Sequence, residues 1–373
     1  MGSITTYHSD GNGALPGGGN PTYSSLVTWE DATTGDQSGQ GLVELTCYYK
    51  NGGHNDGDVD VADSTNTDST NRRIIRSATT DDTPSIGGDA FAGKANTGAD
   101  FVYTLDAGRW VIRLSEEYSR IENLGMKATQ NNIFNDSILH LEGDHTQAIN
   151  FVIRDSANAG DGSCKGARIN AVTALCYQGI VYNVDSEGFL ESAGTTSGFI
   201  CCTAVGNGGM GFYADRDIYC WSCYGANNIT ADFRDDSARW LTGSGWNASK
   251  DTTSDLGGKT TNNKNSNDLI TGGELDGDYL ATQSINWAGG AGDNAGKSPF
   301  GTFEAINDFD GFFNGDSPDP LALFDIAGNA RPAGDDVAWD VGASQYVAAG
   351  GLSIPLVNAG LINRGLVNGG LVN

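Results

Sequence analysis

Short runs of apolar and β-branched residues recur along the middle of the chain, and most of them are bordered by Gly, Asn or Asp. Between Phe101 and Trp246 these runs span 110–114, 137–141, 148–153, 179–182, 198–205 and 217–224. Apolar runs of this length between turn residues indicate buried strands. An earlier run, 41–49, alternates like a strand, whereas the polar residues 51–85 predict a long loop or insertion.

One short helix is expected near the N-terminus, over residues 21–32. Ser24 or Ser25 can cap it, and Leu26 and Trp29 fall on one face at the i, i+3 spacing of a helix. The preceding residues 1–20 are rich in glycine, which predicts an extended arm.

The spacing of the later strands predicts a β-solenoid. Aligning Cys201 with Cys220 gives a step of 19 residues, and the same alignment places Ala204 on Cys223. Short strands and Asn/Gly turns at a period near 20 are typical of solenoids, in which small inward side chains can stack between neighbouring repeats. The L-x-x-L-x-L signature of leucine-rich repeats is absent, and a β-sandwich remains the alternative fold.

The last 21 residues, from Ser353 to Asn373, carry a repeat of the form L-[VI]-N-x-G. Leaving such residues in water forgoes about 25 cal/mol per Å² of apolar surface, so repeated apolar residues at a terminus usually need a partner. We therefore predict that residues 348–373 form an assembly tail. Its apolar positions are Leu356, Val357, Leu361, Ile362, Leu366, Val367, Leu371 and Val372.

Charge and composition limit the classes of partner. The net charge of −26 repels nucleic acid, and no apolar run is long enough for membrane insertion. The 54 glycines, about twice the usual share, are consistent with many turns. Residues 1–11 lack the charged and apolar regions of a signal peptide, so we expect the chain to leave its host cell by lysis.

Seven cysteines are an odd number, and without a signal peptide reduced thiols are expected. The C-x-x-C spacing of Cys220 and Cys223, together with Cys201 and Cys202, leaves a structural zinc site as the alternative. Small buried side chains are the favoured interpretation.

Motifs near both ends of the chain resemble those of one family. The resemblance rests on three sets of residues. They are residues 23–31 followed by 44–49, the N-A-S-x-D motif within 246–251, and the D-x-x-G-x-x-R-P motif of 325–332 followed by W-D-V-G-A in 338–343. The chain resembles right-handed parallel β-helix (pectin-lyase-like) proteins of tailed bacteriophages and related bacterial sequences. The resemblance implies an N-terminal cap and polar insertion over 21–100 and a β-helix with a closing motif over 101–347.

The closing motif has a physical interpretation of its own. Gly328 and Pro332 can shape a turn, Arg331 can pair with Asp325 or Asp340, and Trp339 can cover the open end of a solenoid. Exposed strand edges promote aggregation, so the open end of a solenoid needs a segment that covers it. We therefore expect a structural role for Asp325, Gly328, Arg331, Pro332, Trp339, Asp340 and Gly342.

The sequence supports a catalytic role less strongly than a structural one. Glycosidases need two carboxylates about 5–9.5 Å apart, but a chain with 47 acidic residues offers such pairs by chance. The candidates are Glu116, Glu117, Glu122, Asp155, Asp185, Glu187, Asp215, Asp217, Asp232, Asp235 and Asp236. His145 beside Asp144 is the one plausible acid–base pair, and a surface turn explains it better.

A calcium site has only partial support. Asp56–Asp60 only partly matches a calcium loop, since Val61 replaces the required Gly. At most weak Ca²⁺ binding is therefore expected, and no cofactor.

These observations favour a non-enzymatic virion structural protein that forms a capsid decoration, head fibre or spike. We expect a homotrimer that attaches to the major capsid protein or to other virion proteins through its terminal segments. A host surface glycan is a further partner to consider, and nucleic acid is not expected. The alternative is a tailspike-type polysaccharide depolymerase or a glycan-binding adhesin, which would cut or hold host glycans on the strand faces.

Overall fold

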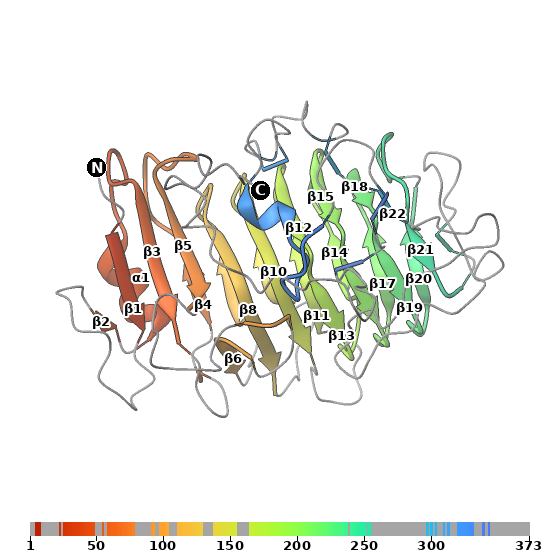
Figure 1. Cartoon of the computed structure of the whole chain (residues 1–373), viewed down its shortest axis with the longest axis horizontal. Coiled ribbons are helices and arrows are strands. Elements are labelled where there is room, and N and C mark those ends of the chain that lie inside the picture. The colour runs from red at the N-terminus through yellow and green to blue at the C-terminus, as the bar shows by residue number, and fades with distance from the viewer. Residues whose placement is uncertain are drawn as a thin grey trace, which may run out of the picture.

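The computed structural model describes residues 4–8, 22–23, 25–48, 54–55, 58–78, 91–93, 97–103, 110–129, 137–154, 164–237, 239–251, 253–254, 296–297, 299–300, 303, 309, 312–313, 319–331, 338–339 and 342–343. Strands predominate, and most of them belong to two parallel sheets that run the length of the molecule (Figure 1). Helical structure among the described residues includes α1 (Leu26–Thr33) and the 3-10 helix η2 (Pro320–Leu323).

The larger sheet has 14 strands. They are β1 (Ile4–His8), β2 (Thr22–Tyr23), β3 (Leu42–Cys47), β5 (Arg72–Ser77), β6 (Asp100–Tyr103), β8 (Arg120–Ala128), β10 (Thr146–Arg154), β12 (Ala174–Tyr177), β13 (Ile180–Tyr182), β15 (Ser197–Ile200), β16 (Thr203–Val205), β18 (Ile218–Trp221), β19 (Tyr224–Ala226) and β21 (Ala248–Ser249).

The smaller sheet has seven strands, in the spatial order β20-β17-β14-β11-β9-β7-β4. They are β4 (Val59–Val61), β7 (Ile112–Leu114), β9 (Ser137–Leu141), β11 (Lys165–Ile169), β14 (Phe189–Glu191), β17 (Met210–Ala214) and β20 (Ala231–Asp235). Two further strands, β22 (Gly296–Lys297) and β23 (Ala338–Trp339), form a small antiparallel pair.

From β3 onward the chain visits the two sheets in turn, and each strand pairs in parallel with the strand one passage later. We call one passage through both sheets a rung. Parallel pairing requires such crossovers, whereas the β-sandwich has antiparallel sheets. The parallel register therefore excludes the β-sandwich alternative.

The predicted strands are largely present, but the predicted register is wrong. β9 spans 137–141 as expected, and the run 198–205 divides into β15 and β16 at Cys201. Phe199 pairs with Cys220 and Ala204 with Gly225, which is a step of 21 residues instead of 19. Within a straight strand a shift of two residues keeps each side chain on the same face, so alternation could not detect it.

A column of residues with positive φ bends the larger sheet along its length. Asn123, Asn150, Gln178, Cys201 and Ser222 have φ between 51° and 57° and occupy equivalent places in successive rungs. Asn tolerates this left-handed conformation better than most residues. The Nδ2 atom of Asn150 also donates to Oδ1 of Asn123 at 3.1 Å, which links two rungs at the bend.

The main core lies between the two sheets and is built from stacked side chains. Phe212 stacks on Phe189 and on Phe233, with ring centroids 4.9 and 4.8 Å apart. This spacing matches the distance between neighbouring strands, about 4.8 Å, because equivalent residues of successive rungs lie directly above one another. On the facing sheet, Cys176 and Cys220 lie in one row with Phe199 between them.

The stretch 51–85, expected as a loop, contains β4 and β5. β5 pairs with both β3 and β8, and β4 forms the end of the seven-stranded sheet. The loop prediction is therefore wrong for residues 59–61 and 72–77. The two sheets begin well before residue 101.

Candidate functional site: the closed ends and the covered face

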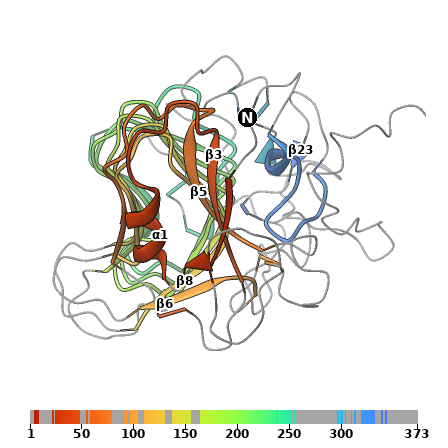
Figure 2. The same cartoon turned by 90° about the vertical axis from the view of Figure 1, so that its left-hand side faces the viewer.

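Helix α1 closes the N-terminal end of the stack (Figure 2). Ser25 caps the helix, since its Oγ accepts the backbone N–H of Thr28 at 3.1 Å. Leu26 and Trp29 are fully buried in the core between the sheets. The cap at Ser25 and the buried face of the predicted helix are therefore confirmed, and the first rungs are shielded from water at this end. The helix is shorter than predicted, since it begins at Leu26 and residues 22–23 of the expected range form β2.

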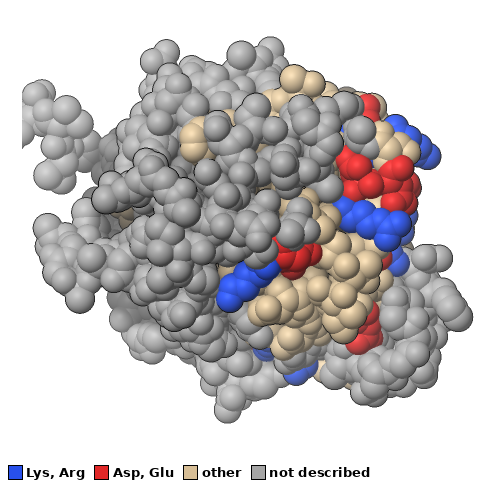
Figure 3. All heavy atoms as spheres, turned by 90° about the vertical axis from the view of Figure 1, so that its right-hand side faces the viewer, with Lys and Arg blue, Asp and Glu red and all other residues tan. Residues whose placement is uncertain are grey.

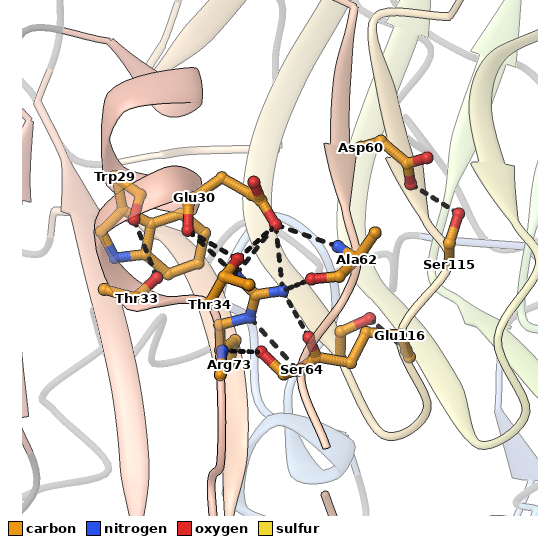
Figure 4. Close-up of polar contacts among 12 residues, drawn as sticks. Trp29, Glu30, Thr33, Thr34, Asp60, Ala62, Ser64, Arg73, Ser115 and Glu116 are labelled. Carbon is orange, nitrogen blue, oxygen red and sulfur yellow. Dashed lines mark hydrogen bonds and ion pairs between the residues drawn. The ribbon is translucent and has the colours of Figure 1, made fainter.

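A buried arginine joins α1 to both sheets (Figure 4). Arg73, on β5, donates to Glu30 of α1 at 3.2 Å and forms an ion pair with Glu116, which follows β7. Its Nη2 atom also donates to the carbonyl of Ala62, and its guanidinium lies 5.6 Å from the ring centre of Trp29. The side chains of Arg73 and Glu116 are 0% and 1% exposed. The buried charge of Glu116 is compensated by Arg73, and Arg73 is shared between Glu116 and Glu30.

The opposite end of the stack is closed by the N-A-S-x-D segment. Asn247 accepts the backbone N–H of Cys223 at 2.9 Å and donates to the carbonyl of Cys220 at 3.0 Å. Asp251 accepts the N–H of Asp232 at 2.8 Å, and Asp232 in turn accepts the N–H of Lys250. These side chains satisfy backbone groups that the strand of a further rung would otherwise have to pair.

The outer face of the 14-stranded sheet is covered by the C-terminal part of the chain (Figure 2). We call the described residues between 299 and 331, with 342–343, the strap. Tyr177 of β12 donates its hydroxyl to the carbonyl of Ala322 at 3.0 Å and packs edge-on against Phe312 and Phe313. The apolar strap residues packed on this face include Phe300, Phe303, Phe309, Phe312, Phe313, Leu321, Ala322 and Leu323.

The described part of the closing motif belongs to the strap. Gly328 has a φ of 81° and donates its N–H to the carbonyl of Asp325, which forms the expected turn. Arg331 is buried and donates to the carbonyl of Gly342 at 2.9 Å. Ile326 packs with Ala343 against the outer face of β10 and β13, so this part of the motif lies over the middle of the sheet.

Several residues singled out in the sequence lie outside the described part of the chain. Pro332 and Asp340 lie outside the described residues, as does the side chain of Trp339, whose backbone belongs to β23. The whole assembly tail, 348–373, also lies outside them. The roles assigned to these residues stay predictions. Of the N-terminal arm, residues 4–8 form β1, which pairs with β3.

Two of the acidic side chains considered for catalysis, Glu122 and Asp144, have partners within the described chain. Glu122 pairs with Arg120 at 2.7 Å, and burial raises the pKa of Glu122. Asp144 accepts the backbone N–H of Val172, and His145 stacks on Tyr118 with ring centroids 4.6 Å apart, so these neighbours form a turn as expected. Asp155 lies outside the described residues.

All seven cysteines are buried, in agreement with the favoured interpretation. Burial raises the pKa of Cys201 to about 12 and raises the pKa values of Cys176, Cys202 and Cys223 well above the ordinary value. The thiolate is the metal ligand and the nucleophile, so these thiols are poorly suited to either role. Within the described residues, no three His, Cys, Asp or Glu side chains are grouped to hold a metal ion.

Comparison of the chain with protein-family models, curated proteins and solved structures finds no match. Among the described residues, no helix is long and apolar enough to span a membrane.

Proposed function

We propose that the two sheets are faces of a right-handed parallel β-helix, and that the protein is a non-enzymatic structural component of a bacteriophage particle. The right-handed sense follows from the strong preference of parallel crossover connections for that hand. The form would be a capsid decoration, head fibre or spike, built in the host cytoplasm and released with the virion.

The observation that carries this proposal is the closure of both ends of the stack. Arg73 and α1 cover the core at one end, where β1 and β2 are the outermost strands of the larger sheet, and Asn247 and Asp251 pair backbone groups at the other. A stack whose ends are covered in this way resists growth by added strands, so it behaves as a body of fixed length. Contacts with other copies and with the particle are then left to the sides and to the terminal segments.

The apolar repeat of residues 348–373 is one of these terminal segments. We propose that it joins three copies and anchors them to the major capsid protein or to another virion protein. The similarity of the N-A-S-x-D and D-x-x-G-x-x-R-P motifs to those of phage β-helix proteins supports the same assignment. Both motifs are engaged in packing and hydrogen bonding within the described chain.

Light-scattering mass in solution tests the assembly step. The full chain is compared with a version that ends at Val347 and with a full chain in which Leu356, Leu361, Leu366 and Leu371 are changed to Ser. We expect a trimer for the full chain and monomers for the other two. The matched control changes Asn358, Asn363, Asn368 and Asn373 to Ser and should stay trimeric. A monomeric full chain, or a trimeric truncation, would contradict the role of the tail.

Immunogold labelling tests the location. Antibodies raised against the purified chain are applied to phage particles released from cells that carry the gene. We expect label at regular positions on heads or tails. Particles without label, and without the chain in their protein profile, would overturn the virion assignment.

A further inference from the structure

A row of polar side chains crosses the outer face of the seven-stranded sheet. Its members occupy paired positions on successive strands and alternate with buried neighbours, so they point away from the core. We call this set the polar row: Asp60, Arg113, His140, Arg168, Tyr213 and Arg234. Leu190 of β14 interrupts the polar row between Arg168 and Tyr213. In Figure 3, which faces the end formed by β20 and β21, basic and acidic side chains gather mainly along one side.

Two arginines of the polar row have carboxylate partners. Arg113 pairs with Asp60 at 3.2 Å and with Glu142, and its guanidinium lies 4.4 Å from the ring centre of Trp110. Arg234 pairs with Asp236 at 3.0 Å. Both charges are therefore neutralised locally, as is usual in a chain with 47 acidic and 21 basic residues.

Arg168, near the centre of the polar row, is different. Within the described part of the chain no carboxylate forms an ion pair with it, although it is only partly exposed. Among the described residues, its side chain donates from Nε to the hydroxyl of Ser192 at 3.0 Å. Burial lowers the pKa of Arg168, because desolvation disfavours its charged form.

The surroundings of Arg168 hold it in place. Ser192 donates to Asn170 or to the carbonyl of Ile169, so its lone pair is oriented toward Nε of Arg168. His140, on the neighbouring strand, lies within the electrostatic reach of Arg168 and Arg113. Burial and these two cations lower the pKa of His140 to about 3, so its ring is neutral at ordinary pH.

We propose that Arg168 is the centre of a carboxylate-binding site on this face. A guanidinium anchored through Nε keeps two Nη groups in a fixed fork, and this fork matches the two oxygens of a carboxylate. The net charge of −26 disfavours a polyphosphate chain, whereas a single carboxylate meets the local positive potential of Arg168. The site does not depend on the virion role.

The carboxylate can belong to a small molecule or to an Asp or Glu side chain of a second copy. NMR of the arginine Nε–Hε groups distinguishes these sources. On the chain that ends at Val347, titration with acetate should shift the Arg168 signal in a saturable way, and chloride at equal ionic strength should not. If a second copy supplies the carboxylate, the full chain should show the shifted signal without acetate, and dilution should remove the shift.

Variants locate the site. Arg168→Gln should weaken acetate binding by about tenfold or more, and Arg168→Lys should also weaken it because the fork is lost. Arg234→Gln is the matched control on the same face and should bind acetate normally. Melting temperatures confirm that each variant is folded, and Ser192→Ala provides a second test because it removes only the anchor of Nε.

The pKa of His140 gives an independent readout. A carboxylate bound at Arg168 offsets one of the two cations that lower this pKa. The pKa should therefore rise when trifluoroacetate, which stays ionised in the pH range where His140 titrates, replaces chloride. A merely structural Arg168 would not produce this shift. If neither acetate nor a second copy changes the Arg168 signal, and trifluoroacetate leaves the His140 pKa unchanged, the proposal is wrong.

Discussion

Glu191 shows how single side chains tie neighbouring rungs together. It ends β14, is fully buried, and accepts the backbone N–H groups of Ala193, Gly194 and Arg216. Burial raises its pKa to about 7, while these donors oppose the rise. Ala193 and Gly194 belong to its own turn and Arg216 to the next rung, so one carboxylate holds two turns in register.

His140 should make the stability of the protein fall in mild acid. Its folded pKa of about 3 lies below the ordinary value of 6.5, so between these values the unfolded chain binds a proton that the folded chain does not. The stability from neutral His140 is complete above pH 6.5 and is lost as pH falls toward 3. The slope is at most about 1.4 kcal/mol per pH unit.

Urea unfolding of the wild type and of His140→Gln at pH 7, 6, 5 and 4 measures this effect. The free energy of unfolding of the variant should fall less between pH 7 and pH 4, with a difference of up to about 3 kcal/mol. Equal pH slopes for the two proteins would contradict the assignment.

For a single residue, the sequence predicts which face of the sheet the side chain occupies better than it predicts which residue that side chain contacts. Cys202 and Cys223 lie in the core, and the N–H of Cys202 contacts the sulfur of Cys223 at 3.4 Å. Cys201, expected to stack on Cys220, instead sits at the bend and packs under the strap. Apolar alternation cannot indicate where a strand bends, because the bend depends on the backbone conformation of one residue.

Among the elements, the N-terminal cap depends most on one charge. Arg73→Met should lower the free energy of unfolding by about 3–5 kcal/mol, because it leaves the carboxylate of Glu116 buried without its partner. Arg234→Met is the matched control, since its ion pair with Asp236 is almost half exposed, and it should cost less than about 1 kcal/mol.

A second variant checks the reason for this loss. In Arg73→Met with Glu116→Leu, no charge is buried at this position, so part of the lost stability should return. If the double variant is less stable than the sum of the single changes predicts, the ion pair is not the cause.

The last rung should depend on Asn247 in a similar way. Asn247→Ala leaves the N–H of Cys223 and the carbonyl of Cys220 without their side-chain partner, and this should cost about 2–4 kcal/mol. Among the backbone amides, that of Cys223 should show the largest increase in hydrogen-exchange rate. Thr242→Ala, in an exposed turn of the same segment, is the control and should change neither quantity.

Elements with strong local signals could be predicted, and those defined by distant partners could not. α1 has a capping residue and two apolar positions on one face, and β9 is an apolar run between turns. β5 carries three arginines, so its sequence is typical of an exposed loop. It is a buried strand because Glu30 and Glu116, each 43 residues away, compensate Arg73.

For the whole molecule, the strap is the least predictable feature. The hydrogen bond from Tyr177 to Ala322 joins residues 145 positions apart, and the closing motif lies over the sheet at a similar separation. A local pattern indicates that aromatic residues will be buried, but it does not indicate against which strands. The described part of the motif lies over the middle of the sheet, and Asn247 and Asp251 lie at the end of the stack, while the role of Trp339 stays a prediction.

The covered face also predicts that the strap and the sheets unfold together. Phe313 is 1% exposed and packs on Tyr177 and on Phe303, Phe309 and Phe312 of the strap. Phe313→Ala should therefore cost about 3–5 kcal/mol. Detachment of the strap would expose the outer face of the 14-stranded sheet, so the strap and the sheets should unfold together. The single unfolding transition should therefore move to a lower urea concentration and should not divide into two.

Circular dichroism of the strands and tryptophan fluorescence, followed in the same urea series, test this coupling. The two probes should give coincident transitions in the wild type and in Phe313→Ala. Ile229→Ala, at a side chain that is 79% exposed, is the control and should shift the free energy of unfolding by less than about 0.5 kcal/mol. A separate early transition seen only by fluorescence would mean that the strap detaches on its own. The sheets would then be stable without their cover, and the strap would be a removable element of the assembly.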